Sequence, residues 1–243
     1  MNIIAHKTDF YLTDEFFRDI ITKEYVDGVS LDVVLNSENR LLVYNYKTIG
    51  DNTIGKIQNL PLNQVIQSNI LILEDALELI YENRRNIPIY LNLIPNILSI
   101  ESDEDLKALN KRNMEYIMEI NRVLKRYSNL NIKMHSISRN LVLLLKKEFL
   151  KNEIGFVVST GDLTYTDVSY YVFPTYMIDD NVFRELRINN KGIVIYIDNE
   201  GDLAVVTEKY NSGSTSDFSN EVLRGLSFII DQPILLDRIF RKS

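Results

Sequence analysis

A serine and an aspartate lie two residues apart inside an apolar segment that is predicted to be a buried strand. In the stretch VDGVSLDVVLN, Ser30 and Asp32 alternate with apolar residues, so both side chains point to the same face of the strand. A carboxylate in apolar surroundings must be paired or bound, because an isolated buried charge is strongly disfavoured. This stretch is therefore a candidate for a functional site.

A histidine and a lysine follow the first predicted strand, at residues 2–5. His6 is either a hydrogen-bonded structural residue or an acid or base that works near neutral pH. Lys7 is a possible ion-pair partner for Asp32, which would give that carboxylate a structural role. His135, the only other histidine, either supplies a second acid or base or occupies an incidental place in the core or rim.

The segments that must position these residues alternate between strand and helix character. The predicted strands are residues 2–5, 28–35, 41–46, 87–93, 131–137, 155–159, 170–173, 192–197 and 226–230. The predicted helices are residues 13–25, 74–84, 103–127, 138–150, 180–187 and 217–224, and residues 211–219 are expected to be a loop. This alternation indicates parallel strands joined by crossover helices.

One segment departs from the alternation, because turn-forming residues join two apolar strands directly. The tetrapeptide Asn36-Ser37-Glu38-Asn39 favours a hairpin over a helical crossover. Nothing in AHKT after the first strand is glycine, so the glycine-rich turn typical of an open nucleotide-binding sheet is missing. In a barrel, by contrast, sites are built at the carboxyl ends of the strands, where His6 and Lys7 are expected.

Composition limits the class of protein. A chain of 243 residues that is 45% hydrophobic is typical of one globular domain, predicted over residues 1–243. The absence of cysteine excludes disulfides and thiolate chemistry. A net charge of -7 argues against nucleic-acid binding, and the sequence predicts no membrane span and no secretion signal, which indicates a cytoplasmic protein.

Several motifs in order along the chain resemble the glycerophosphodiester phosphodiesterase family. IIAHK, VDGVSLDVVLN and the segment beginning RLLVYNYKTIGDNTIG are similar to the family's strand ending in His-Arg-Gly, its Gly-x-Glu-x-Asp strand and its strand ending in His-Asp before a threonine-rich loop. ILEDALELI, IPIYLNLIP, GIVIYIDNEGDL and GLSFIIDQPILLDRI resemble its later motifs, with the looser stretch at residues 99–169. The resemblance implies a (β/α)8 TIM barrel of the α/β class, with a small hairpin insertion after the second strand.

The family reaction, as the resemblance implies it, needs a divalent cation held by two glutamates and one aspartate. Two histidines act as general acid and base, and an arginine beside the first of them supports the phosphate. Carboxylate oxygens suit Mg²⁺ or Ca²⁺. His6 keeps the first histidine, while Lys7 replaces the arginine and loses its bidentate fork. These two residues are the catalytic candidates.

The other family positions are mostly changed. Asp32 keeps the aspartate and is the one remaining metal-ligand candidate. Ser30 and Asn92 stand where the glutamates belong, and Asn45 stands where the second histidine belongs. A site with one carboxylate in place of three binds divalent cations weakly, and asparagine does not titrate near neutral pH. We therefore expect no bound cofactor, or Mg²⁺ or Ca²⁺ if the family site survives.

The resemblance and its departures together predict a phosphodiesterase-like barrel that has lost the metal-dependent reaction. Such a protein would bind a small phosphate-containing or polyol ligand, or a protein partner, at the former active-site mouth. The alternative is an active phosphoric diester hydrolase with an altered site, involved in lipid metabolism. It would use His6 and Asp32, with His135 as a further candidate and Lys7 in place of the lost charges. A third reading is a structural interaction module with a plugged mouth. A set of aromatic residues is expected either in the core or around the mouth: Tyr44, Tyr46, Tyr170, Tyr171, Phe173, Tyr176 and Tyr196.

Overall fold

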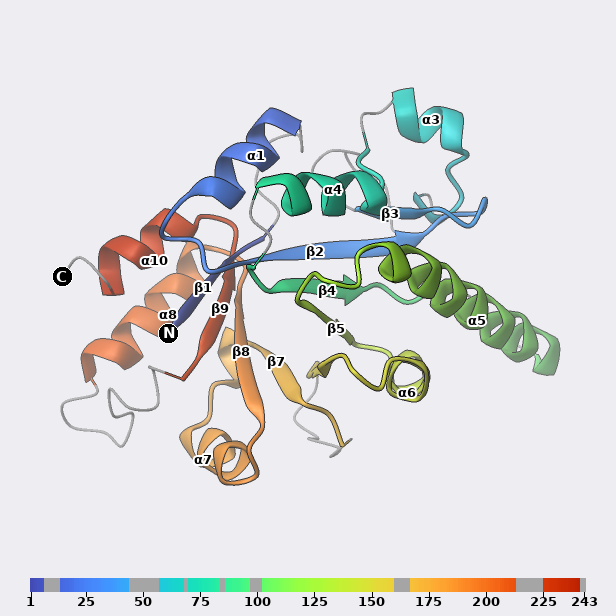
Figure 1. The fold of residues 1–243 in the computed structure, drawn as a ribbon. Coiled ribbons are helices and arrows are strands. Elements are labelled where there is room, and N and C mark those ends of the chain that lie inside the picture. The colour runs from blue at the N-terminus through green and yellow to red at the C-terminus, as the bar shows by residue number, and fades with distance from the viewer. Residues whose placement is uncertain are drawn as a thin grey trace.

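Eight parallel strands close into a barrel in the computed structural model, which describes residues 1–6, 14–43, 57–67, 70–83, 86–96, 102–159, 167–212 and 225–240. The barrel strands, in spatial order, are β1 (Asn2–Ala5), β2 (Gly28–Leu35), β4 (Ile89–Leu93), β5 (Ile132–Ser136), β6 (Ile154–Val157), β7 (Tyr170–Pro174), β8 (Gly192–Ile197) and β9 (Ser227–Ile230). Strand β1 pairs with both β2 and β9, which closes the ring. The predicted TIM barrel is thus confirmed (Figure 1).

The hairpin predicted after the second barrel strand is also present. Strand β3 (Leu41–Val43) pairs antiparallel with β2 on the outside of the barrel, and Leu35 faces Leu41. The side-chain oxygen of Asn36 accepts hydrogen bonds from the backbone N–H of Glu38 and of Arg40, and Asn39 takes a positive φ of 57°. These local bonds fix the tight turn. The rest of the predicted strand, residues 44–46, lies outside the described residues.

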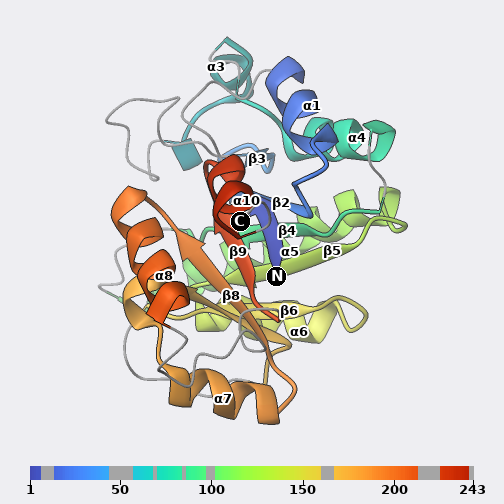
Figure 2. The same ribbon diagram turned by 90° about the vertical axis from the view of Figure 1, so that its left-hand side faces the viewer.

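Helices surround the strands, as Figures 1 and 2 show from two directions. They are α1 (Asp14–Thr22), α4 (Leu73–Asn83), α5 (Asp103–Arg126), α6 (Arg139–Glu148), α7 (Asp180–Ile188), α8 (Glu200–Ser212) and α10 (Pro233–Phe240), together with the short α3 (Leu62–Gln67) and η1 (Thr175–Met177). Ser102, Ser138 and Asp179 cap α5, α6 and α7 by accepting hydrogen bonds from backbone N–H groups of the first turn. Within the described residues, no helix is long and apolar enough to span a bilayer.

Most predicted elements are observed with small shifts at their ends, but α3, α8 and η1 were not predicted, and α10 was implied only by the resemblance of GLSFIIDQPILLDRI to the family's closing strand and helix. The apolar residues of α8 are consecutive, in the run Leu203–Val206, so they lack the spacing that marks an amphipathic helix. The loop predicted at residues 211–219 is wrong at its start, because residues 211 and 212 still belong to α8. The helix predicted at residues 217–224 lies outside the described residues.

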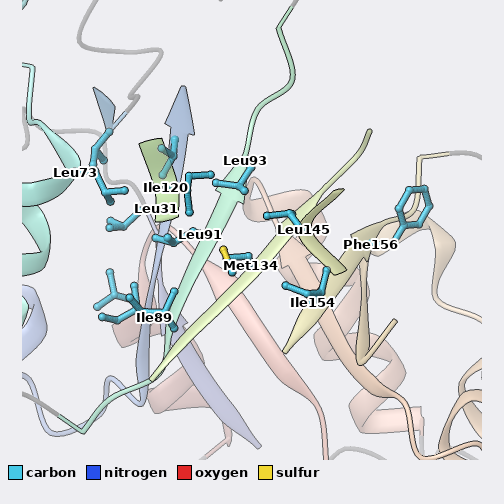
Figure 3. Close-up of a cluster of buried hydrophobic side chains, with 14 of the residues drawn as sticks. Leu31, Leu73, Ile89, Leu91, Leu93, Ile120, Met134, Leu145, Ile154 and Phe156 are labelled. Atoms are coloured by element: carbon cyan, nitrogen blue, oxygen red, sulfur yellow. The ribbon is translucent and has the colours of Figure 1, made fainter. Parts of the chain in front are cut away.

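Alternation along the strands separates two apolar compartments, and a third, small cluster lies at the hairpin: Val34, Leu42, Ile57, Val65 and Ile70. Side chains that point outward, such as Leu31, Leu91 and Met134, pack against Ile120 of α5 and Leu145 of α6 in the larger compartment (Figure 3). The side chains that point inward form a smaller cluster inside the barrel, made of Ile4, Tyr90, Tyr170, Val172, Val194 and Ile229. This inner cluster lies inside the barrel directly below the polar residues at the carboxyl ends of the strands.

Two glycines make room for Tyr170, one of the two tyrosines of the inner cluster. Gly155 on β6 and Gly192 on β8 are the register partners of Tyr170 on β7. A Cβ atom at Gly155 would lie 2.3 Å from a carbon of the Tyr170 ring, and one at Gly192 would lie 2.9 Å from the Tyr170 Cβ. The ring therefore lies where the side chain of residue 155 would otherwise be.

Gly155→Ala should destabilise the protein by about 1–3 kcal/mol, because the added methyl group overpacks a closed interior. The free energy of unfolding in urea measures the effect. Gly201→Ala is the matched control: it lies in the first turn of α8, where its Cβ would come no closer than 3.0 Å to the side-chain oxygen of Asn199. The control should be neutral or stabilising, by at most about 1 kcal/mol. Equal losses from the two substitutions would contradict the packing described for Tyr170.

Candidate functional site

A cavity of about 340 Å³ opens above the inner cluster. Polar side chains from the first four strands of the ring line one part of it: His6, Ser30, Asp32, Asn92 and His135. Mostly apolar residues from the remaining strands line the other part: Val157, Val158, Ser159, Val172, Pro174, Tyr176, Tyr196 and Ile229. The cavity therefore has one polar and one largely apolar side.

Strand register brings the polar residues together. Asp32 on β2, Asn92 on β4 and His135 on β5 are successive partners across three neighbouring strands. Ser30 comes two residues before Asp32 on the same face of β2. The backbone N–H of His6 donates to the carbonyl of Ile230 at 3.0 Å, which holds the end of β1 against β9. Residues from four separate motifs of the sequence therefore meet in one layer.

The carboxylate of Asp32 is held by two neighbours. The side-chain nitrogen of Asn92 lies 2.7 Å from Oδ1, and Nε2 of His6 lies 3.5 Å from Oδ2. Because a carboxylate can only accept hydrogen bonds, Asn92 must present its NH₂ group to Asp32. Asp32 is only 7% exposed, so this pairing compensates for burial of its charge.

The orientation of the His6 ring is fixed by a carbonyl and an aromatic edge. Nδ1 lies 3.3 Å from the backbone oxygen of Ser30, and the ring meets Tyr196 edge-on with centroids 5.2 Å apart. Since the carbonyl can only accept, Nδ1 carries a proton. Nε2 has no hydrogen-bond partner within the part of the chain that the structure describes. This nitrogen is buried 3.5 Å from Oδ2 of Asp32, with which the ring forms an ion pair when it carries both protons.

His135 lies in the cavity wall and is bonded to the barrel interior. Its Nδ1 lies 3.0 Å from the phenol oxygen of Tyr170, and the two rings are nearly perpendicular. Burial lowers the pKa of His135 to about 3, although the charge of Asp32 acts in the opposite direction and that of His6 adds to the lowering. Burial also raises the pKa of Tyr170 well above its usual value. At neutral pH the pair is a neutral imidazole and a protonated phenol.

Several sequence predictions are answered by this arrangement. His6, Ser30, Asp32 and Asn92 converge as the resemblance implied, and His135 joins them at the cavity. Lys7 and Asn45 lie outside the described residues, so the predicted ion pair between Lys7 and Asp32 stays a prediction.

The aromatic set divides between core and cavity. Tyr170 belongs to the inner cluster, Tyr171 and Phe173 belong to the outer core, and Tyr176 and Tyr196 line the cavity. Tyr44 and Tyr46 lie outside the described residues. The bond between Tyr170 and His135 was not predicted. The sequence signal for it is the pair of glycines, Gly155 and Gly192, at corresponding places on the flanking strands.

The residues present do not fit the divalent cation that the family resemblance implies. Such a cation needs several oxygen ligands with negative charge, but the described lining offers one carboxylate, and the neighbouring amide faces it with nitrogen. Ser30 is too short to replace a glutamate and carries no charge. Among the described residues, no group of three or more histidine, aspartate or glutamate side chains is placed to hold a metal ion.

The fold of the barrel is similar to that of solved phosphodiesterase structures. A glycerophosphodiester phosphodiesterase from Parabacteroides distasonis is similar over 99% of this chain and 97% of its own, with a TM-score of 0.69 and 16% identity. A phosphodiesterase from Oleispira antarctica, solved in complex with the product sn-glycerol-3-phosphate, is similar over 100% of this chain and 97% of its own, with a TM-score of 0.73 and 16% identity.

Sequence comparisons, unlike the structural comparison, give no match. No family model matches it, and no curated protein matches it significantly. A likeness with 16% identity shows the fold, and it extends over the full length of the chain. This protein therefore has the closed (β/α)8 barrel of the glycerophosphodiester phosphodiesterases.

Proposed function

We propose that this protein is a glycerophosphodiester phosphodiesterase-like barrel whose metal-dependent reaction is impaired, and that its cavity binds a small polyol or phosphate-containing ligand. The observation that carries the proposal is the hydrogen bond from the Asn92 amide to the Asp32 carboxylate. In the family pattern that position holds a second carboxylate, and two adjacent carboxylates need a cation between them. An amide and a carboxylate satisfy each other without one.

The acid and base groups are reduced as well. The resemblance assigns the family's second histidine to position 45, where this chain has asparagine. Proton transfer from a positioned side chain typically contributes 10²–10⁴-fold, so this loss alone would slow the reaction by about two to four orders of magnitude. His135 does not restore the function, because its Nδ1 is bonded to Tyr170 and its low pKa keeps it neutral.

The cavity itself supports a binding role. Its volume of about 340 Å³ is not filled by side chains of the described residues, which favours a binding role over the structural module with a plugged mouth. The Oleispira phosphodiesterase was solved with sn-glycerol-3-phosphate, a small polyol phosphate of suitable size. Tyr176, which is 76% exposed, also lies at the cavity, and it is the feature that a protein partner would contact.

A second candidate is a phosphoric diester hydrolase of altered design. The feature in its favour is that His6, Asp32 and His135 line one cavity. In that reading His6 acts as the base through Nε2, the carbonyl of Ser30 orients the ring through Nδ1, and the Asp32 carboxylate stabilises the ring once it is protonated. The reading requires measurable turnover without the family metal cluster.

The purified protein should show little or no hydrolysis of glycerophosphocholine or glycerophosphoglycerol in the presence of Mg²⁺ or Ca²⁺. Release of sn-glycerol 3-phosphate measures the reaction, and His6→Ala is the control for activity that arises in this cavity. Hydrolysis at ordinary enzyme rates, roughly 1 s⁻¹ or faster, that disappears in His6→Ala would overturn the proposal and support the second candidate.

Restoring the carboxylates should restore cation binding. The double variant Ser30→Glu/Asn92→Glu is expected to bind Ca²⁺ or Mg²⁺, because three carboxylates would then converge at one end of the barrel. At a cation concentration of about 100 times Kd the gain in stability is about 2.7 kcal/mol, visible as a rise in Tm. Ser30→Gln/Asn92→Gln matches the size change without the charge and should not respond. A similar rise in Tm for the unchanged protein would contradict the metal-free site.

The low pKa of His135 should make the protein less stable in mild acid. Below pH 6.5 this residue is protonated in the unfolded chain, whereas in the folded protein it stays neutral down to about pH 3. Because the unfolded state binds more protons between these two values, the free energy of unfolding rises with pH across that window. The contribution is about 1.4 kcal/mol per pH unit. His135→Gln removes the titrating group, so the stability difference between the two proteins, measured by urea unfolding from pH 7 to pH 4, isolates it. A difference that does not change with pH would show that His135 is protonated in the folded state.

A further inference from the structure

The buried phenol of Tyr170 determines which nitrogen of His135 carries the proton. The bond to Nδ1 of His135 is the single hydrogen bond of this phenol within the described part of the chain. If the imidazole donated to the phenol oxygen, the phenolic proton would be buried without an acceptor, which is costly. The phenol therefore donates to Nδ1, and the proton of the neutral imidazole is on Nε2.

The phenol is held in place from several sides. Its ring lies over Gly155, and it meets the ring of Tyr90 edge-on with centroids 5.8 Å apart. The ammonium of Lys133 lies 5.5 Å from the centre of the Tyr90 ring. Tyr170 itself is only 2% exposed. A side chain packed in this way cannot rotate to another acceptor. The packing around Tyr170 therefore fixes the tautomer of His135.

The polar side of the cavity consequently presents a donor and an acceptor. His135 offers a donor at Nε2, and the carboxylate of Asp32, which also lines the cavity, offers an acceptor. Nε2 of His6 is itself buried, 3.5 Å from Oδ2 of Asp32. A hydroxyl group can both accept and donate, so it matches this donor and acceptor better than a group that only accepts.

The charge of the cavity favours the same class of ligand. Among the described residues that line it there is one carboxylate, Asp32, and no lysine or arginine. A phosphate group placed beside Asp32 would be repelled by that carboxylate, whereas a neutral hydroxyl group would not. The apolar side, which includes Val157, Val172 and Ile229, can contact the carbon atoms of a polyol.

We propose that His135 is a ligand-binding residue whose Nε2–H donates to a hydroxyl oxygen of a neutral polyol, and that Tyr170 is the positioning residue that fixes this donor. The inference rests on the proposed function of the cavity as a binding site. It adds the chemical class of the group that the cavity recognises and the residue that prepares it.

The tautomer can be observed without a ligand. The chain has only two histidines, so the imidazole nitrogens of the ¹⁵N-labelled protein give four signals in a long-range ¹H–¹⁵N spectrum. The proton of His135 should be on Nε2 at neutral pH, and Tyr170→Phe, which removes only the hydroxyl, should release it to a mixture of tautomers. Tyr90→Phe is the matched control, because Tyr90 lies beside His135 without a hydrogen bond to it, and it should leave the signals in place. A proton on Nδ1 in the unchanged protein would overturn the inference.

Binding provides the second test, by calorimetry with glycerol, sn-glycerol 3-phosphate and inorganic phosphate. Glycerol should bind, and phosphate alone should not. His135→Leu should weaken glycerol binding roughly five- to tenfold, the usual effect of losing one hydrogen bond. Tyr170→Phe should weaken it by the inverse of the remaining share of the Nε2–H tautomer, about twofold for an even mixture, while Tyr90→Phe should not weaken it. Thermal unfolding confirms that each variant is folded.

The two levels of proposal fail in different ways. If the unchanged protein binds none of the three compounds, the cavity is not the binding site proposed above. If it binds glycerol and Tyr170→Phe binds it equally well, the positioning role is wrong and the binding site stands. If phosphate alone binds and glycerol does not, the assignment to a neutral polyol is wrong.

Discussion

Closure of the barrel is the constraint on which the whole polar site depends. Strand β1 has only four residues, yet it pairs with β2 on one side and β9 on the other, so the first and last motifs of the chain become neighbours. The same closure sets the register that aligns Asp32, Asn92 and His135 across three strands. Inward and outward side chains then serve different purposes. The outward ones bind the helices through a large apolar layer, and the inward ones have space only for a small cluster and a cavity.

Electrostatic balance would allow that cavity to exist without a cation. A single buried carboxylate is compensated by the Asn92 amide, which donates to it, and by the His6 imidazole 3.5 Å away when that ring carries both protons. Adding one more carboxylate would break this balance, and a bound cation would then be needed to restore it. The change from three carboxylates to one would alter what the barrel can recognise: a network of donors and acceptors selects hydroxyl and amide groups, whereas a cation selects anions. The fold is the same in both cases, and the difference lies in a few side chains at the strand ends.

The sequence predicted the barrel strands and most of the polar residues because both depend on local alternation. Ser30 and Asp32 share a face in any strand, and the resemblance placed His6 and Asn92 beside them. The partnership of His135 with Tyr170 was not predictable in this way, because the two residues lie on strands separated by β6, and their contact depends on the space left by Gly155. Helix α8 was missed because its consecutive apolar residues give no helical spacing. In each miss, packing between distant segments decided a feature that local pattern does not encode.

The glycines beside Tyr170 also limit how this barrel can change over time. Three positions on three adjacent strands, Gly155, Tyr170 and Gly192, share one volume inside the ring. A larger residue at either glycine position is excluded while the tyrosine is present. A smaller residue at position 170 would leave a void unless one of the glycines were replaced by a larger residue at the same time. Substitutions at these sites are therefore acceptable in combination and harmful one at a time. Such mutual dependence would preserve an aromatic ring at position 170 through extensive divergence elsewhere in the chain, while the bond to His135 favours tyrosine over phenylalanine there.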